Sequence, residues 1–80
     1  MKTEINENEL ELVVGGTVVV SDLGKVGFTT IGKKYKLQNV GWREARNYAE
    51  DLHDKNKNMS NAEFDQFVYS QFVDKDWIIP

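Results

Sequence analysis

The fold class is decided by residues 31–55, whose sequence reads IGKKYKLQNVGWREARNYAEDLHDK. The first part of this stretch favours a β-hairpin, because Gly32 can supply the positive φ that a tight turn between two short strands needs. The second part, from Trp42 to Leu52, repeats apolar residues at spacings of three and four between charged ones, which is typical of an amphipathic helix. Strand signals that give way to helix signals in one short chain predict an α+β fold.

The neighbouring segments extend this pattern in both directions. Thr17–Val20 is β-branched throughout, which favours a strand, and Ser60 followed by Glu63 is a capping-box pattern that starts a second helix. We expect one small domain, a short antiparallel β-ribbon followed by an αα-hairpin, with strands at about 17–20, 26–31 and 34–37 and helices at about 42–55 and 61–73. The apolar tail at residues 77–79 is expected to fold back on the core, because it would otherwise be exposed at a free end.

The composition excludes several classes of protein. A chain of 80 residues with 40% hydrophobic residues has room for one marginal core. Cysteine is absent, which excludes disulfides, thiolate metal sites and a catalytic cysteine. The apolar runs fall far short of the roughly 20 residues of a membrane-spanning helix, and no apolar signal core follows Met1, which disfavours the general secretory route.

The negative charge is concentrated near the N-terminus. The formal net charge is −3, and residues 1–16 account for it with one lysine and four glutamates, whereas residues 17–80 carry equal numbers of basic and acidic residues. All the aromatic residues lie beyond residue 27. Aromatic side chains bury the most surface per residue, so we expect the C-terminal two-thirds of the chain to build the core and residues 1–16 to be dispensable to it.

Residues 1–16 carry a spaced pattern that ends in two adjacent glycines, Gly15 and Gly16. Counted backwards with Gly16 in first place, the fourth, seventh, eighth and twelfth places hold, in that order, Val13, Leu10, Glu9 and Ile5. This arrangement resembles the double-glycine leader, a bacteriocin-type signal sequence found on peptide precursors that peptidase-containing ABC transporters export. The resemblance is limited to residues 1–16 and does not extend to residues 17–80.

The resemblance implies that the peptidase domain of an ABC exporter recognises the four spaced residues and cuts between Gly16 and Thr17. These residues fall within an arc of about 140° on a helical wheel, so an induced amphipathic helix could lie in an apolar groove of the peptidase. A narrow protease cleft would admit the glycines because they have no Cβ. The chain would be made in the bacterial cytoplasm and secreted after leader removal, and Gly15→Val should block cleavage without changing the fold of residues 17–80.

The same segment also allows a purely structural interpretation. Residues 9–14 alternate between polar and apolar side chains over most of their length, and Gly15-Gly16 would then be the turn of a hairpin that continues into residues 17–20. The chain would in that case be a non-exported, cytoplasmic interaction domain. Deleting residues 1–16 should leave a folded cargo if the leader interpretation holds, and should abolish cooperative unfolding if the hairpin is structural.

The activity and target of residues 17–80 are not identified by any motif. Their uncharged, glycine-poor composition disfavours membrane permeabilisation, so we expect a bacteriocin-like or accessory globule. One candidate binding patch combines basic and aromatic residues, namely Lys33, Lys34, Tyr35, Lys36, Trp42, Arg43 and Arg46. Such a cluster can contact phosphates and bases, but lysines on a ribbon edge also prevent aggregation, and the lack of a basic excess disfavours nucleic acid as a partner.

Catalysis is not expected, nor is a metal or cofactor. His53 is the only histidine, and an imidazole near the end of a helix has a favourable interaction with the helix dipole. Asp51 and Asp54 are so close to it in sequence that the three side chains would be scattered around the helix, away from a common metal ion. The serines have no neighbouring base in the sequence.

Overall fold

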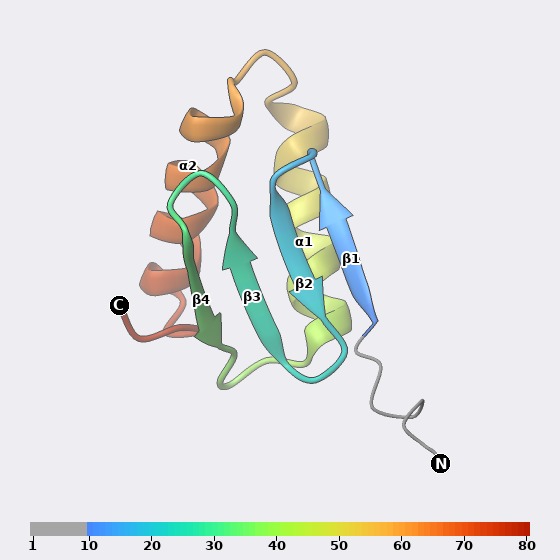
Figure 1. The fold of residues 1–80 in the computed structure, drawn as a ribbon, viewed down its shortest axis with the longest axis vertical. Helices are drawn as coiled ribbons and strands as arrows, with labels where there is room; N and C mark the ends of the chain where they lie inside the picture. The colour runs from blue at the N-terminus through green and yellow to red at the C-terminus, as the bar shows by residue number, and fades with distance from the viewer. Residues whose placement is uncertain (1–9) are drawn as a thin grey trace.

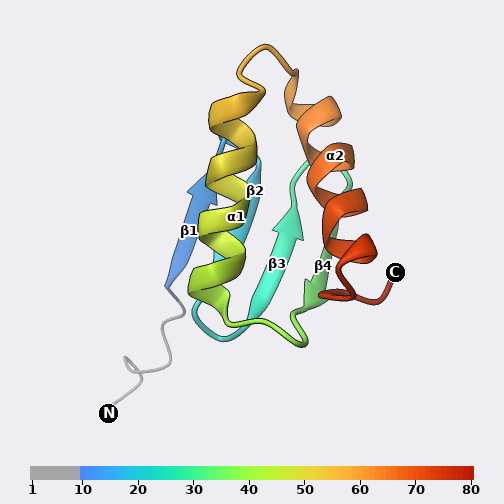
Figure 2. The same cartoon turned by 180° about the vertical axis from the view of Figure 1, so that it is seen from behind.

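A four-stranded antiparallel sheet and two helices make up residues 10–80, the part of the chain that this computed structural model describes. The strands are β1 (Glu11–Val14), β2 (Val18–Ser21), β3 (Lys25–Phe28) and β4 (Lys33–Lys36), and they lie in this order across the sheet. Helices α1 (Trp42–Lys55) and α2 (Asn61–Asp74) both cover the same face of the sheet (Figures 1 and 2). The predicted α+β class, a β-ribbon followed by two helices, is therefore confirmed.

The strands differ from the predicted ribbon in their bounds and number. The segment predicted at 26–31 ends at Phe28, because the N–H groups of Ile31 and Gly32 both donate to the Phe28 carbonyl (3.1 and 2.8 Å) and turn the chain. Gly32 has the positive φ predicted for it (+79°), but the predicted start of the following strand at residue 34 is wrong, since Lys33 is already the first residue of β4. The fourth strand, β1, is the one that the hairpin alternative requires.

The helices begin and end close to their predicted bounds. The capping box of α2 is confirmed: the Glu63 N–H donates to Ser60 Oγ (3.2 Å) and the Ser60 N–H donates to Glu63 Oε1 (3.0 Å). The apolar stripes face the sheet, and their fully or nearly fully buried members are Ala45, Ala49, Leu52, Phe64, Val68 and Phe72. Local sequence signals are sufficient for both helices, because a periodic stripe and, in α2, a capping box need no distant partner.

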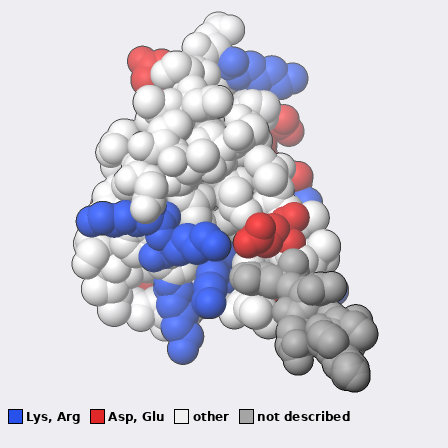
Figure 3. Space-filling view, in the orientation of Figure 1, with Lys and Arg blue, Asp and Glu red and all other residues white. Residues whose placement is uncertain are grey.

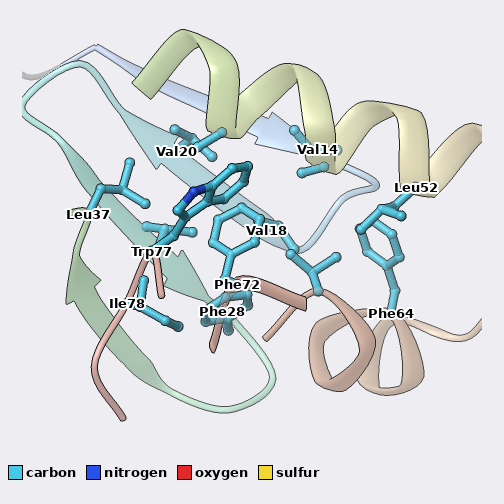
Figure 4. Close-up of a cluster of buried hydrophobic side chains, with 14 residues drawn as sticks. Val14, Val18, Val20, Phe28, Leu37, Leu52, Phe64, Phe72, Trp77 and Ile78 are labelled. Atoms are coloured by element: carbon cyan, nitrogen blue, oxygen red, sulfur yellow. The ribbon is translucent and has the colours of Figure 1, made fainter. Parts of the chain in front are cut away.

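The core lies between the sheet and the helices (Figure 4). Phe28 from the sheet packs edge-on against Phe72 (ring centroids 6.4 Å apart), and the ring of Trp77, in the tail that follows α2, also packs edge-on against Phe72 (5.1 Å). The tail therefore folds back on the core as predicted. Val14 is only 3% exposed and belongs to the same cluster, so the expectation that residues 1–16 are dispensable to the core is wrong at this residue.

Candidate functional site

The predicted cleavage site, Gly15, Gly16 and Thr17, forms the connection between β1 and β2. The Thr17 N–H donates to the Val14 carbonyl (3.3 Å), and the two glycines have φ values of +63° and +78°. A turn with positive φ at both central residues has the twist that antiparallel strands prefer, and glycine adopts it without steric strain. Both glycines therefore have a conformational role in the folded chain.

The two described recognition residues, Leu10 and Val13, are exposed. Val13 pairs with Val19 and Val14 pairs with Val18, and alternation along the strand turns Val14 towards the helices and Val13 towards the uncovered face. Leu10 is 50% exposed and Val13 is 59% exposed. The other predicted recognition residues, Ile5 and Glu9, lie outside the described residues.

Thr17 is held in place by Asp65, a residue of α2 that the sequence analysis did not single out. Thr17 Oγ1 donates to Asp65 Oδ2 (2.7 Å), and Thr30 donates to the same oxygen through its N–H (2.8 Å) and its hydroxyl. Thr17 is 1% exposed and Asp65 is fully buried. Since a buried carboxylate is costly without hydrogen-bond donors, the three donors together make Asp65 a clamp that ties two loops of the sheet to α2.

One sequence signal could have found Asp65. On a helix, Asp65 shares the face of Val68 and Phe72, which follow it by three and seven residues. An acidic residue on an apolar face is unusual unless a partner satisfies it. The partners themselves could not be named from the sequence, because Thr17 and Thr30 reach Asp65 across the fold.

The other side of the turn packs against His53 and Phe64. A Cβ added at Gly15 would lie 2.9 Å from His53 Cδ2 and 2.9 Å from Phe64 Cε2, whereas one added at Gly16 would meet no atom within 4 Å. The His53 ring also packs edge-on against Phe64, with centroids 5.3 Å apart. The expectation that Gly15→Val leaves the fold unchanged is therefore wrong, because the larger side chain would collide with two rings.

The residues of the predicted basic patch lie on two different faces. The Tyr35 ring packs against Phe28 (6.0 Å) on the helix-covered face, so its neighbours Lys34 and Lys36 project from the uncovered face. Lys33 lies opposite Phe28 in the pairing of β4 with β3, on the same side of the sheet as Tyr35. The remaining members, Trp42, Arg43 and Arg46, lie on α1 and have partners there: Arg43 lies over the Trp42 ring (4.9 Å) and Arg46 forms an ion pair with Glu50 (3.1 Å). The structure therefore does not bring the seven residues together.

On the uncovered face of the sheet, the neighbours of Lys34 and Lys36 include a third lysine, Lys25. Lys25 lies directly opposite Lys36 in the pairing of β3 with β4, and Lys34 lies opposite Gly27 on the same face. Figure 3 shows basic side chains gathered on one side of this face, with acidic ones beside them. We call Lys25, Lys34 and Lys36 the lysine face. Lys25 could not be grouped with the other two lysines from the sequence, because only the strand register shows which residues of neighbouring strands lie opposite each other.

Residues 10–80 contain no group of three acidic or histidine side chains that could hold a metal ion. No helix in this range has the length and apolar character needed to cross a lipid bilayer.

Comparisons of the chain with protein-family models, with curated proteins and with solved structures find no match.

Proposed function

We propose that the chain is the precursor of a secreted bacteriocin-like or accessory peptide, and that the peptidase domain of an ABC exporter cuts its leader after Gly16. The exposure of Leu10 (50%) and Val13 (59%) is the observation that carries this proposal. Packing of the described residues leaves both aliphatic side chains largely in water, and both stand at places that the double-glycine pattern requires. Val14, which that pattern does not require, is buried instead.

Strand geometry alone does not account for Val13. Alternation turns its side chain to the uncovered face of the sheet, but residues on the solvent side of an antiparallel sheet are normally polar. A polar residue at this position would lose only the cross-strand contact with Val19, worth about 0.2 to 1 kcal/mol. The valine is explained if it has a second partner, and an apolar groove of a peptidase is such a partner.

Cleavage would require the hairpin to open. The leader is expected to bind as a helix, whereas Val13 is paired with Val19 in the sheet and Thr17 is held by Asp65. One segment cannot be a helix and a strand at the same time, so the peptidase would act on chains whose β1 has detached from β2. A four-residue strand at the edge of a sheet detaches at a lower free energy than global unfolding.

Two neighbouring substitutions test the proposal. Val13→Ser and Val14→Ser make the same chemical change one residue apart, and each variant is incubated with a purified leader peptidase domain while its mass is recorded. We expect Val13→Ser to slow cleavage at least about tenfold, since it removes an apolar contact worth about 1.5 kcal/mol or more, and to leave stability nearly unchanged. Val14→Ser should lower stability by about 3 kcal/mol and be cut at least as fast as the unsubstituted chain.

The control for this experiment is a known double-glycine substrate cut in the same reaction. Cleavage should release a species that begins at Thr17. If the unsubstituted chain still has its full mass of 9.2 kDa after the control substrate is consumed, the leader proposal is wrong. Equal slowing by both serine variants would also count against it, because recognition would then not distinguish the exposed residue from the buried one.

A second candidate function is a non-exported interaction domain in which residues 11–16 are purely structural. The burial of Val14 and the hydrogen bond from Thr17 to Asp65 favour it. Under this alternative the peptidase leaves the chain intact, and deleting residues 1–16 abolishes cooperative unfolding because it removes β1 and part of the core. A deleted chain that unfolds cooperatively, together with cleavage after Gly16, would exclude the alternative.

A further inference from the structure

The lysine face carries a charge arrangement that the fold itself does not explain. Lysines on an edge strand such as β4 discourage pairing with other chains, which accounts for Lys34 and Lys36. Lys25 lies on β3, an internal strand, directly opposite Lys36, and like charges placed directly opposite each other destabilise a sheet. Among the described residues neither of these two forms an ion pair, whereas Lys34 approaches Glu11 at 3.8 Å.

Exposed aliphatic side chains lie at the end of the sheet where Lys25 and Lys36 meet. Leu23 in the turn between β2 and β3 is 62% exposed, and Ile79 is 67% exposed. The Leu37 N–H donates to the Gly24 carbonyl (2.8 Å), which places the turn with Leu23 beside the end of β4. Ile79 lines a surface hollow together with Lys36. Lysine and aliphatic side chains therefore share one end of the molecule.

We propose that the lysine face, together with Leu23 and Ile79, docks the protein on an anionic lipid membrane. Lysine side chains are attracted to a diffuse anionic surface without needing a fixed geometry, and exposed aliphatic side chains can enter the boundary between headgroups and acyl chains. The contact is peripheral and uses no membrane-spanning element.

The arrangement favours lipid over nucleic acid as the anionic partner. Single-stranded nucleic acid binding normally uses aromatic side chains on which bases stack, and the Tyr35 ring is turned to the helix-covered face. The Arg43 guanidinium is stacked on Trp42, and both lie on α1. The lysine face thus offers charge and aliphatic surface, but none of the stacking groups of the predicted patch.

Glu11 connects this surface to the leader. It lies in β1 and approaches Lys34 across the uncovered face. Removal of residues 1–16 would take away Glu11 and all of the net negative charge, so a processed chain should bind an anionic surface more tightly than its precursor. Only this last expectation rests on the proposed cleavage, since the lysine face exists in the full chain.

Vesicle co-sedimentation of the full chain tests the proposal. The probes are vesicles of phosphatidylcholine alone and vesicles with equal parts of phosphatidylglycerol and phosphatidylcholine, at low and physiological salt. We expect binding only to the mixed vesicles, weakened by salt. The double variant Lys25→Gln/Lys36→Gln should lower the partition coefficient about 25-fold, about fivefold for each lysine, and Leu23→Ser should lower it severalfold.

The matched control is Lys55→Gln/Lys57→Gln, which removes the same charge at the far end of α1 and in the following loop. It should change the partition coefficient less than about threefold, because the end of α1 and the loop after it lie at the opposite end of the molecule from the β2–β3 turn and the end of β4 (Figure 1). Equal effects of the two double variants would overturn the proposal, since net charge alone would then govern binding. Absence of binding to the mixed vesicles would also overturn the proposal. So would a chain that binds RNA or DNA through Lys25 and Lys36 and does not bind the vesicles.

These outcomes are separable from those of the cleavage assay. If no peptidase cuts the chain but its binding to vesicles depends on Lys25 and Lys36, the docking proposal stands and the leader proposal is wrong. If the chain is cut after Gly16 but does not bind vesicles that contain phosphatidylglycerol, the leader proposal stands and the docking proposal is wrong. Glu11→Gln in the full chain should raise the partition coefficient by up to about fivefold without any cleavage.

Discussion

The hydroxyl of Thr17 provides a direct test of how the turn between β1 and β2 is held. Thr17→Val keeps the shape of the buried side chain and removes the 2.7 Å hydrogen bond to Asp65. A hydrogen bond to a charged group contributes about 1.5 to 3 kcal/mol. Asp65 keeps both donors from Thr30, so we expect the free energy of unfolding to fall by about 2 kcal/mol.

Thr17→Ser is the matched control for this substitution. It keeps the hydroxyl and loses one methyl group, which should cost about 0.8 kcal/mol. Urea unfolding can be followed by tryptophan fluorescence, because Trp77 is only 9% exposed in the folded chain and becomes exposed on unfolding. With a slope of about 1 kcal/mol per molar urea, the midpoint should fall by about 2 M for the valine variant and by less than about 1 M for the serine variant.

A valine variant that is as stable as the serine variant, or more stable, would contradict this expectation. In that case the methyl group would matter more than the hydroxyl, and Asp65 would not be a clamp on the turn. Asp65→Asn provides an independent check, because it weakens the same hydrogen bonds without touching any leader residue. It should speed cleavage by the leader peptidase if opening of the hairpin limits the rate.

Three further perturbations follow from the structure. Gly15→Ala should destabilise the fold by about 2 to 3 kcal/mol, because it adds a collision to the cost of a positive φ, whereas Gly16→Ala should cost only about 1 kcal/mol in urea unfolding. Lys25→Gln/Lys36→Gln should raise the thermal midpoint slightly, in keeping with about 0.2 to 1 kcal/mol of relieved repulsion, and a lowered midpoint would contradict this. Partial burial, with a smaller contribution from the hydrogen bond and the charge of Tyr35, raises the pKa of Tyr69 above its ordinary value of 10.0. The unfolded state therefore ionises first, and the free energy of unfolding should fall as pH rises above that value, a fall that Tyr69→Phe should reduce.

The helices could be predicted from the sequence because their signals are local. The Ser60 capping box and the stripe through Phe64, Val68 and Phe72 each lie within one segment, and the structure reproduces them. The bounds of the strands were less predictable, because a strand ends where pairing ends. The segment expected to continue to Ile31 stops at Phe28 since the backbone of Thr30 donates to Asp65 and is not available to a neighbouring strand.

The candidate sites show the same limit more strongly. The spacing of Leu10 and Val13 can be read from the sequence, but their exposure depends on pairing with β2. The clamp at Asp65 joins residues 48 and 35 positions apart, and no local pattern names such partners. The predicted patch failed to assemble for a related reason, since one-residue alternation sends Tyr35 and its lysine neighbours to opposite faces.

Residues 10–14 combine two patterns. Leu10, Leu12 and Val14 follow the period of a strand, and Leu10 and Val13 follow the spacing of the leader, so the two patterns share Leu10 and differ at Val13. Because the two patterns are compatible, one segment can be both a strand and a leader, and the order of events decides which structure forms. A hairpin forms within about 1 to 10 μs, so a released chain would pair β1 before it met an exporter.

The apparent affinity of the peptidase would then be its intrinsic affinity multiplied by the fraction of chains with an open hairpin. If opening costs about 2 kcal/mol, close to the value expected for the Thr17 hydrogen bond, the leader would bind about thirtyfold more weakly than an isolated leader peptide. Thr17→Val and Asp65→Asn should each close most of that gap, while Val13→Ser should weaken the isolated peptide and the full chain by the same factor. A full chain that already binds as tightly as the peptide would show that β1 does not restrain the leader, whatever its pairing in the folded state.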